Sequence, residues 1–105
     1  MTTRNQNARA LAALGHDARL AIFRLLVKKG HDGLRVGDIR DFLDLAPSTL
    51  AHHLTALVDA GLVVQEKQGR EVFNKANFDA MQALMTFLTS ECCEGLEPAR
   101  KDDAA

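Results

Sequence analysis

Apolar side chains recur at helical spacing in four segments of the first sixty residues. These segments cover about residues 8–14, 17–29, 34–44 and 47–60, and turn signals separate them. Gly15, Gly30 and Gly61 follow the first, second and fourth segments, as glycine commonly does at helix C-termini. Pro47 fits the first position of the fourth helix, where no N–H donor is needed. The pattern predicts two helices, followed by two more that are joined by a tight turn over residues 45–47. His16 or Asp17 is expected to cap the second helix.

The pattern changes after Gly61. Two β-favouring runs, residues 62–66 and 71–74, flank the polar turn Lys67-Gln68-Gly69-Arg70, which predicts a β-hairpin. A last helix is expected from an Asn77 cap to near Gly95. The chain is therefore predicted to be mainly α-helical with one β-hairpin. Residues 1–96 are expected to form one domain and residues 97–105 a disordered tail.

Two helices joined by a short turn form a helix-turn-helix, whose second helix enters the major groove of DNA, and a hairpin after it makes a winged helix. In the fourth helix His52 lies roughly 200° around from Leu50 and so points away from the apolar face. Small hydroxyls and an imidazole on that side can reach base edges and phosphates, whereas His53 is expected to pack or cap. The predicted contacts to double-stranded DNA are Pro47, Ser48, Thr49, Ala51, His52 and Thr55 in the helix, and Lys67 and Arg70 at the hairpin tip.

Composition and charge limit the function classes. The chain has 105 residues and a net charge of −1, from 13 basic and 14 acidic residues, so bulk charge does not favour nucleic acid. Residues 35–75 hold five basic and six acidic side chains, so this region is not a basic patch. The charged turn of the predicted hairpin has two interpretations: it contacts DNA or, as the alternative, it is simply solvated, as charged turns often are. No secretion signal or membrane-spanning apolar run is visible, which predicts a soluble, cytoplasmic protein that does not associate with membranes. The sequence also lacks a spaced nucleophile–base pair, a phosphate-binding loop and a C-x-x-C pair, so it does not read as an enzyme.

Two apolar stripes, on the first and last helices, exceed what one small core can cover. Pairing both stripes across a two-fold axis would bury them, and a cofactor pocket along the last helix is the weaker alternative. We therefore predict a homodimer. The predicted interface residues are Leu11, Leu14, Phe78, Met81, Leu84, Met85 and Leu88.

These features together resemble the ArsR/SmtB family of winged-helix repressors. The resemblance is carried by LGHDARLAIFRLL, by VGDIRDFLDLAPSTLAHHLTALVDAGLV and by the hairpin EKQGREVFNKAN, and covers roughly residues 8–93. It implies a homodimer that pairs through its first and last helices, binds a near-palindromic operator and leaves DNA when an inducer binds. A winged helix used only for protein contacts is the alternative from another class.

The inducer expected for such a family member depends on its cysteines and histidines, and here the chain departs from the best-known members. Their third helix begins with two metalloid-binding cysteines, whose positions here are Arg35 and Gly37. The family's zinc and nickel sites on the last helix use histidine and carboxylates, and no histidine lies between residues 54 and 105. The pair Cys92-Cys93 resembles instead the subgroup with arsenic-binding cysteines at the end of the last helix.

Cys92 and Cys93 are neighbours and thus unsuited to a structural disulfide, because adjacent Cα atoms are about 3.8 Å apart where disulfides need roughly 4.4–6.8 Å. Glu91, Glu94 and the negative end of a helix should raise thiol pKa values, which disfavours a redox or persulfide sensor. A thiophilic centre drives deprotonation by binding. We predict that the pair binds an arsenic(III) inducer, inorganic or organic, with no catalytic cofactor. The alternatives are a thiol-redox or persulfide-sensing repressor, or incidental thiols.

Overall fold

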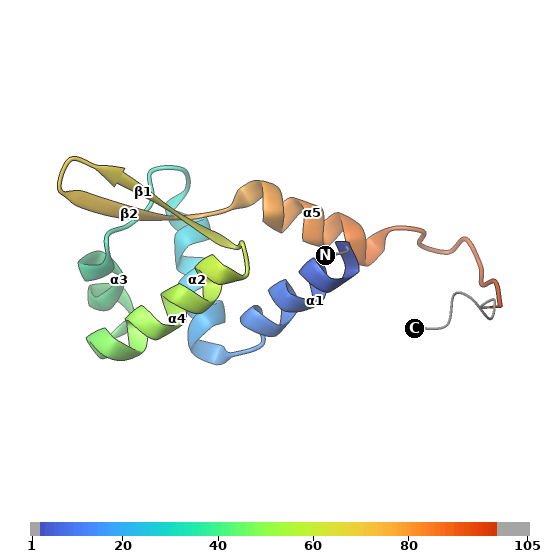
Figure 1. Ribbon diagram of the computed structural model, residues 1–105, viewed down its shortest axis with the longest axis horizontal. Coiled ribbons are helices and arrows are strands. Elements are labelled where there is room, and N and C mark those ends of the chain that lie inside the picture. The colour runs from blue at the N-terminus through green and yellow to red at the C-terminus, as the bar shows by residue number, and fades with distance from the viewer. Residues whose placement is uncertain (1–2, 99–105) are drawn as a thin grey trace.

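The computed structural model describes residues 3–98 and shows a helix-turn-helix followed by a hairpin (Figure 1). The elements are α1 (Thr3–Leu14), α2 (Asp17–Lys29), α3 (Val36–Leu43), α4 (Pro47–Asp59), β1 (Val63–Gln68), β2 (Glu71–Ala76) and α5 (Phe78–Thr89). Figure 1 shows α3, α4 and the hairpin at one end of the elongated molecule, with α1 and α5 toward the other. The predicted mainly helical winged helix-turn-helix is confirmed. The hairpin β1–β2 is called the wing below.

The core lies where α2 packs against α4 and β2. The most deeply buried side chains of the core come from α2, α3 and α4, because each of these helices presents the apolar stripe that its sequence predicts. The wing contributes the first residue of β1 and the last residues of β2 to the core. The base of the wing is therefore buried, while its tip projects into solvent. The fully buried apolar residues are Ile22, Leu26, Ile39, Leu50, Leu57, Leu62 and Val63.

Local signals place most helix ends where the sequence predicts them. Nδ1 of His16 accepts a hydrogen bond from the Ala18 amide at 3.2 Å, which confirms His16 as the cap of α2. Pro47 is the first residue of α4, and Ala60 ends it. Asn77 caps α5 through the Ala80 amide, and its Nδ2 donates to the carbonyl of Gly61 at 2.9 Å. Asn77 thereby ties the start of α5 to the loop after α4.

Leu34, which the sequence places in the third helix, pairs with the wing instead. Its amide donates to Asn74 O at 2.9 Å and its carbonyl accepts from Asn74 N at 2.7 Å, forming a single-residue antiparallel bridge beside β2. Gly33 precedes it at φ 75°, and a Cβ there would lie 2.7 Å from the Asn74 carbonyl oxygen. The close approach explains why the helix starts only at Val36.

The wing turn is tighter than predicted. Gln68 pairs with Glu71, so Gly69 and Arg70 alone form the turn, with Gly69 at φ 65°. Lys67 pairs with Val72. Lys67 therefore lies within β1 rather than at the tip, whereas Arg70 is at the tip as predicted.

The last helix is shorter than predicted, ending at Thr89 rather than near Gly95. Two hydroxyls bond the final carbonyls: Thr89 Oγ1 donates to Met85 O at 3.1 Å, and Ser90 Oγ donates to Phe87 O at 2.7 Å. Ser90 then adopts an extended conformation. As a result, Cys92 does not continue the helical stripe of α5.

Residues 97 and 98 have no regular structure, and the rest of the predicted tail, residues 99–105, lies outside the described residues. Within the described part, no helix has the length and apolarity needed to cross a bilayer.

Candidate DNA-binding surface, dimer face and thiol pair

The polar face of α4 is open to solvent. The six helix residues predicted to contact DNA are all exposed, while Leu50, Leu54 and Leu57 on the opposite face are buried. The α4 backbone is thus held by its apolar side with its polar side free, as a recognition helix requires. The exposed residues are Pro47, Ser48, Thr49, Ala51, His52 and Thr55.

His53 is buried behind this face and links α4 to the start of α2. Arg19 Nε donates to His53 Nδ1 at 3.2 Å, and the His16 ring lies with its centroid 4.6 Å from the His53 ring. Because Nδ1 accepts, the neutral ring carries its proton on Nε2. The packing role predicted for His53 is confirmed, whereas its bond to Arg19, 34 residues away, has no signal in the sequence.

The environment of His53 makes stability depend on pH. Burial lowers the pKa of His53, and the neighbouring charges of His16, Arg19 and His52 lower it further. The unfolded chain therefore takes up a proton near the ordinary histidine pKa that the folded chain still excludes, so stability present above that pH is lost as pH falls. We expect the free energy of unfolding to decrease from pH 7.5 to 5.5 in urea titrations. His53→Asn keeps an acceptor for Arg19 but cannot titrate, so its pH dependence should be flatter; equal slopes would contradict this explanation.

The wing carries two cationic side chains that are open to a partner. Lys67 and Arg70 are exposed, and neither forms an ion pair with any described residue. By contrast, Lys75 Nζ lies 2.7 Å from Glu66 Oε2 and holds the pKa of that carboxyl below its usual range. The wing tip thus presents Arg70 as an uncompensated positive charge, the kind of group that contacts phosphate.

The predicted dimer residues divide into two groups. Leu11 is 41% exposed, Met85 53% and Leu88 57%, so the protomer leaves these apolar side chains uncovered; Phe87, which the sequence analysis missed, is also exposed. Leu14, Phe78 and Met81 are partly buried against the core. Leu84 is only 5% exposed and belongs to the core of the protomer. The core of the protomer therefore covers one part of the apolar stripe on α5 and leaves the other part exposed to solvent.

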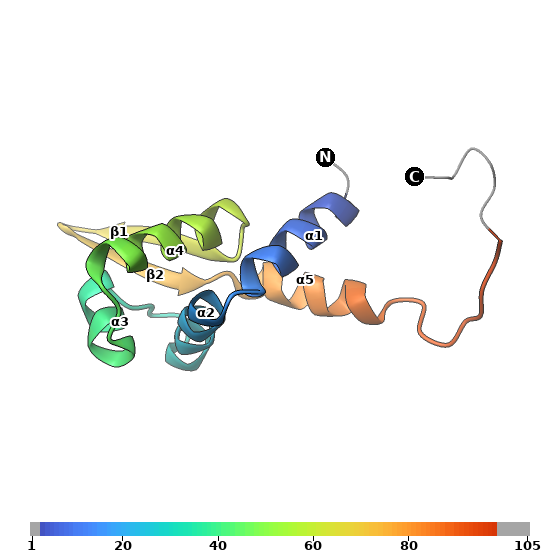
Figure 2. The same ribbon diagram turned by 90° about the horizontal axis from the view of Figure 1, so that it is seen from below.

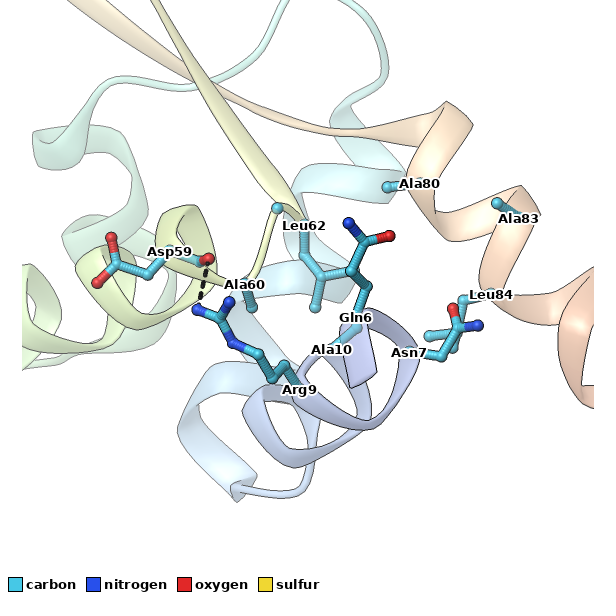
Figure 3. Close-up of a pocket in the computed structure, with 11 residues that line it drawn as sticks. Gln6, Asn7, Arg9, Ala10, Asp59, Ala60, Leu62, Ala80, Ala83 and Leu84 are labelled. Atoms are coloured by element: carbon cyan, nitrogen blue, oxygen red, sulfur yellow. Dashed lines mark hydrogen bonds between the residues drawn. The ribbon is translucent and has the colours of Figure 1, made fainter. Parts of the chain in front are cut away.

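α1 and α5 diverge from one another (Figure 2), and a cleft of about 370 Å³ lies between them and the end of α4 (Figure 3). Its walls are mostly small apolar side chains, with Gln6, Asn7 and Arg9 from α1 as polar members. Arg9 donates to the Asp59 carbonyl at 3.3 Å. Nδ2 of Asn7 is buried and has no hydrogen-bond partner among the described residues. A buried donor of this kind costs about 1–3 kcal/mol if nothing accepts from it.

The two thiols lie in a turn after α5. Cys92 and Cys93 are exposed and free, and their sulfurs are 3.0 Å apart. Glu91 and Cys93 have φ of 60° and 66°, and this left-handed backbone accompanies the approach of the two side chains. The Cys93 thiol hydrogen-bonds the Cys92 thiol, and this contact raises the pKa of Cys92. The predicted direction is confirmed for Cys92, but the cause is the second thiol rather than the flanking glutamates.

No cluster of three or more histidine, cysteine or carboxylate side chains suited to a metal occurs among residues 3–98. The Cys92–Cys93 pair is thus a two-sulfur site. His16 caps α2, and His31 lies in the turn after α2, where its ring packs on Phe78 with centroids 4.8 Å apart.

Comparison with known proteins agrees with this geometry. Residues 14–66 match the model of a helix-turn-helix domain family. The chain is 31% identical over 91 residues to the HTH-type transcriptional regulator YbzH of Bacillus subtilis, covering 75% of this chain and 91% of that protein. An ArsR-like transcriptional regulator from Rhodococcus sp. RHA1 superposes with a TM-score of 0.76 at 26% identity, covering 88% of this chain and 84% of the other. The chain belongs to the ArsR family of winged helix-turn-helix regulators.

As an ArsR-family protein, the chain is a DNA-binding transcriptional regulator and not an enzyme. A relative in Halobacterium salinarum, whose name proposes it as an arsenical resistance operon repressor, is 37% identical over 60 residues. That match covers 57% of this chain and 46% of the relative, so the chain spans about half of that protein's length.

Proposed function

We propose that this ArsR-family regulator is a repressor that binds operator DNA as a homodimer and is released when arsenic(III) binds Cys92 and Cys93. The observation that carries the inducer assignment is the exposed pair of sulfurs 3.0 Å apart. The two sulfurs already lie side by side, so little rearrangement is required for both to bind one atom. The name of the Halobacterium relative adds a second, weaker line of support.

The chemistry of arsenic favours a two-thiol site for organic forms. Inorganic arsenic(III) prefers three thiolates, whereas an aryl or methyl arsenic(III) has one bond occupied by carbon and needs only two. Each protomer supplies two, and a third would come from the partner subunit or from a free thiol such as glutathione. Arsenic displaces the thiol protons as it binds, so binding does not require a preformed thiolate.

Two features of the protomer support the homodimer. The protomer leaves the apolar side chains of Leu11 on α1 and of Met85 and Leu88 on α5 exposed. The nearby cleft contains the unpaired Asn7 donor, for which a second subunit can supply an acceptor. A two-fold dimer places one α4 in each half-site, with half-site centres about 10 bp apart.

The position of the thiols suggests how binding reaches DNA. Only Ser90 and Glu91 lie between the end of α5 and Cys92. The Cys92 amide donates to Thr89 O, the carbonyl of the last helical residue, at 3.2 Å. Bonding both sulfurs to one arsenic atom replaces the thiol–thiol hydrogen bond and fixes this turn in one conformation, which changes the end of a dimer helix. A difference of about 1–3 kcal/mol in operator affinity between the free and liganded forms is enough for regulation.

The wing and α4 should affect DNA binding in different ways. Arg70→Ala is expected to weaken binding to specific and random DNA alike and to reduce the slope of log affinity against log salt by about one, as loss of a phosphate contact does.

His52→Ala should instead lose discrimination at particular base pairs, by about 1–3 kcal/mol. Anisotropy titrations over a salt series check both. If His52→Ala weakens specific and random DNA equally, His52 does not read bases.

Arsenic binding is tested directly on the protein without DNA. Phenylarsine oxide should bind the reduced protein at one arsenic per protomer, measured by mass spectrometry under native conditions and by loss of titratable thiols. Cys92→Ser and Cys93→Ser are matched single-atom controls, and each should lose this tight binding. Equal binding by either variant would contradict a two-thiol site.

A further inference from the structure

Arg35 joins the start of α3 to the tip of the wing. Its Nε donates to Asp38 Oδ2 at 3.1 Å in the first turn of α3, and its Nη1 donates to Glu71 Oε1 at 2.9 Å. The Arg35 amide also donates to Asp38 Oδ2 at 3.1 Å. The Asp38 carboxylate therefore both caps the helix and holds the Arg35 guanidinium in position. Glu71 is the first residue of β2 and directly follows Arg70. One side chain therefore spans 36 residues of sequence between helix and wing.

The backbone presents Arg35 to the wing in a fixed position. Leu34, the residue before it, is paired with Asn74 through two backbone hydrogen bonds. The Asn74 side chain is fully buried, and its Nδ2 donates to Leu34 O at 3.1 Å while its Oδ1 accepts from Gln65 at 2.8 Å. Arg35 thus emerges beside β2 from a rigid bridge. The Arg35 guanidinium lowers the pKa of the Asp38 carboxyl, as expected for a persistent hydrogen-bonded pair.

The outer half of the wing has little else to hold it. All residues of β1 after Val63 are exposed, as are the first two of β2. A two-stranded hairpin without a packed face is marginally stable by itself. Among the described residues, the Arg35–Glu71 ion pair is the one that connects the outer wing to the helix-turn-helix.

We propose that Arg35 is a positioning residue for DNA binding, which holds the wing tip at a fixed place relative to α4 by bridging Asp38 and Glu71. Arg70 then points at the DNA backbone without the wing having to be ordered on binding. Loss of the bridge leaves Arg70 intact but adds an ordering cost to each encounter with DNA. This inference rests on the proposed use of the wing tip in DNA binding.

A rival account gives the same residues another role. If Arg35 itself contacts a phosphate, Asp38 and Glu71 merely compete with DNA for it. The two accounts predict opposite signs for Glu71→Ala. Removing an acidic group beside DNA, and freeing a cation, would strengthen binding under the rival account, whereas loss of wing positioning weakens it.

The test uses the full chain and an operator duplex recovered by selection with the wild-type protein. We expect Arg35→Gln and Glu71→Ala each to weaken operator binding about threefold to tenfold, and the double variant to be no weaker than either single variant. The slope of log affinity against log salt should stay at the wild-type value. Glu66→Ala is the matched control, since it removes an equal charge from the wing and breaks two contacts that lie within the wing, the pair with Lys75 and the hydrogen bond from Gln68; it should not weaken binding.

A readout without DNA separates failure of this inference from failure of the proposed function. Hydrogen exchange of the Gln68 and Phe73 amides, which face the opposite strand of the wing, should be about threefold to tenfold faster in Arg35→Gln and Glu71→Ala, and unchanged in Glu66→Ala. Tighter binding by Glu71→Ala, or a salt slope reduced by about one in Arg35→Gln, would overturn the positioning role. Unchanged exchange in both variants would overturn it as well, whether or not the protein binds the operator.

Discussion

Leu88→Glu and Met85→Glu are each expected to give a monomer that binds operator DNA about 100-fold or more weakly than the wild type. Both side chains are more than half exposed in the protomer, so the substitutions leave the protomer core intact. In a dimer they would bury an unpaired carboxylate, which costs several kcal/mol. A monomer then loses the gain from linking two recognition helices, which is typically 10²–10⁴ in affinity. Sedimentation velocity and anisotropy titrations measure the two effects.

The exposure of the substituted residue in the protomer decides whether a variant reports on the dimer or on the stability of the protomer. Leu84 is buried in the protomer, so Leu84→Glu would unfold the protein and could not report on the dimer. Phe42 is 68% exposed on α3, away from α1 and α5, and Phe42→Glu is the matched control for an added charge on an exposed apolar residue. It should remain dimeric. A Leu88→Glu protein that is still a dimer at micromolar concentration would exclude the α1–α5 interface.

Asn74→Ala is expected to lower the free energy of unfolding by about 2–3 kcal/mol. The Asn74 side chain is fully buried and makes two hydrogen bonds, one to Leu34 O and one from Gln65. Alanine removes both bonds and leaves a cavity at the buried base of the wing. Because the Asn74 side chain connects both strands of the wing to the Leu34 bridge, its loss should also loosen the base of the wing. Urea denaturation at one fixed protein concentration measures the change.

Gln65→Ala provides the control for Asn74. It removes the same side-chain hydrogen bond from the exposed end, where water replaces the lost partner. The expected loss is below about 1 kcal/mol. Equal losses in the two variants would show that the hydrogen bond to the Leu34 carbonyl and the packing around Asn74 contribute little.

Much of the fold could be predicted because its signals are local. The apolar spacing of α2 and α4, Pro47 at the start of α4, and glycine after α2 each act within a few residues of one helix. The polar face of α4 follows from the same periodicity, so its exposed residues were found without the structure. The wing followed from two β-favouring runs and a turn containing Gly69.

The misplaced features depend on contacts between distant parts of the chain. Leu34 has a helical neighbourhood in sequence, but its backbone pairs with Asn74, 40 residues later. The Arg35–Glu71 bridge likewise has no local signal. Periodicity placed Leu84 on an apolar stripe without saying whether the protomer or a partner covers it. The early end of α5 depends on two hydroxyl groups bonding to its last carbonyls, a competition that apolar spacing does not show.

The central claim is that arsenic bound by Cys92 and Cys93 releases the operator. The most direct measurement follows the anisotropy of a labelled operator duplex, saturated with reduced protein, as phenylarsine oxide is added. The account predicts release of the wild type near one arsenic per protomer, while Cys92→Ser/Cys93→Ser binds the operator with wild-type affinity and stays bound. Release of the double variant by the arsenical, or a wild type that ignores arsenicals and responds to persulfide, would contradict it.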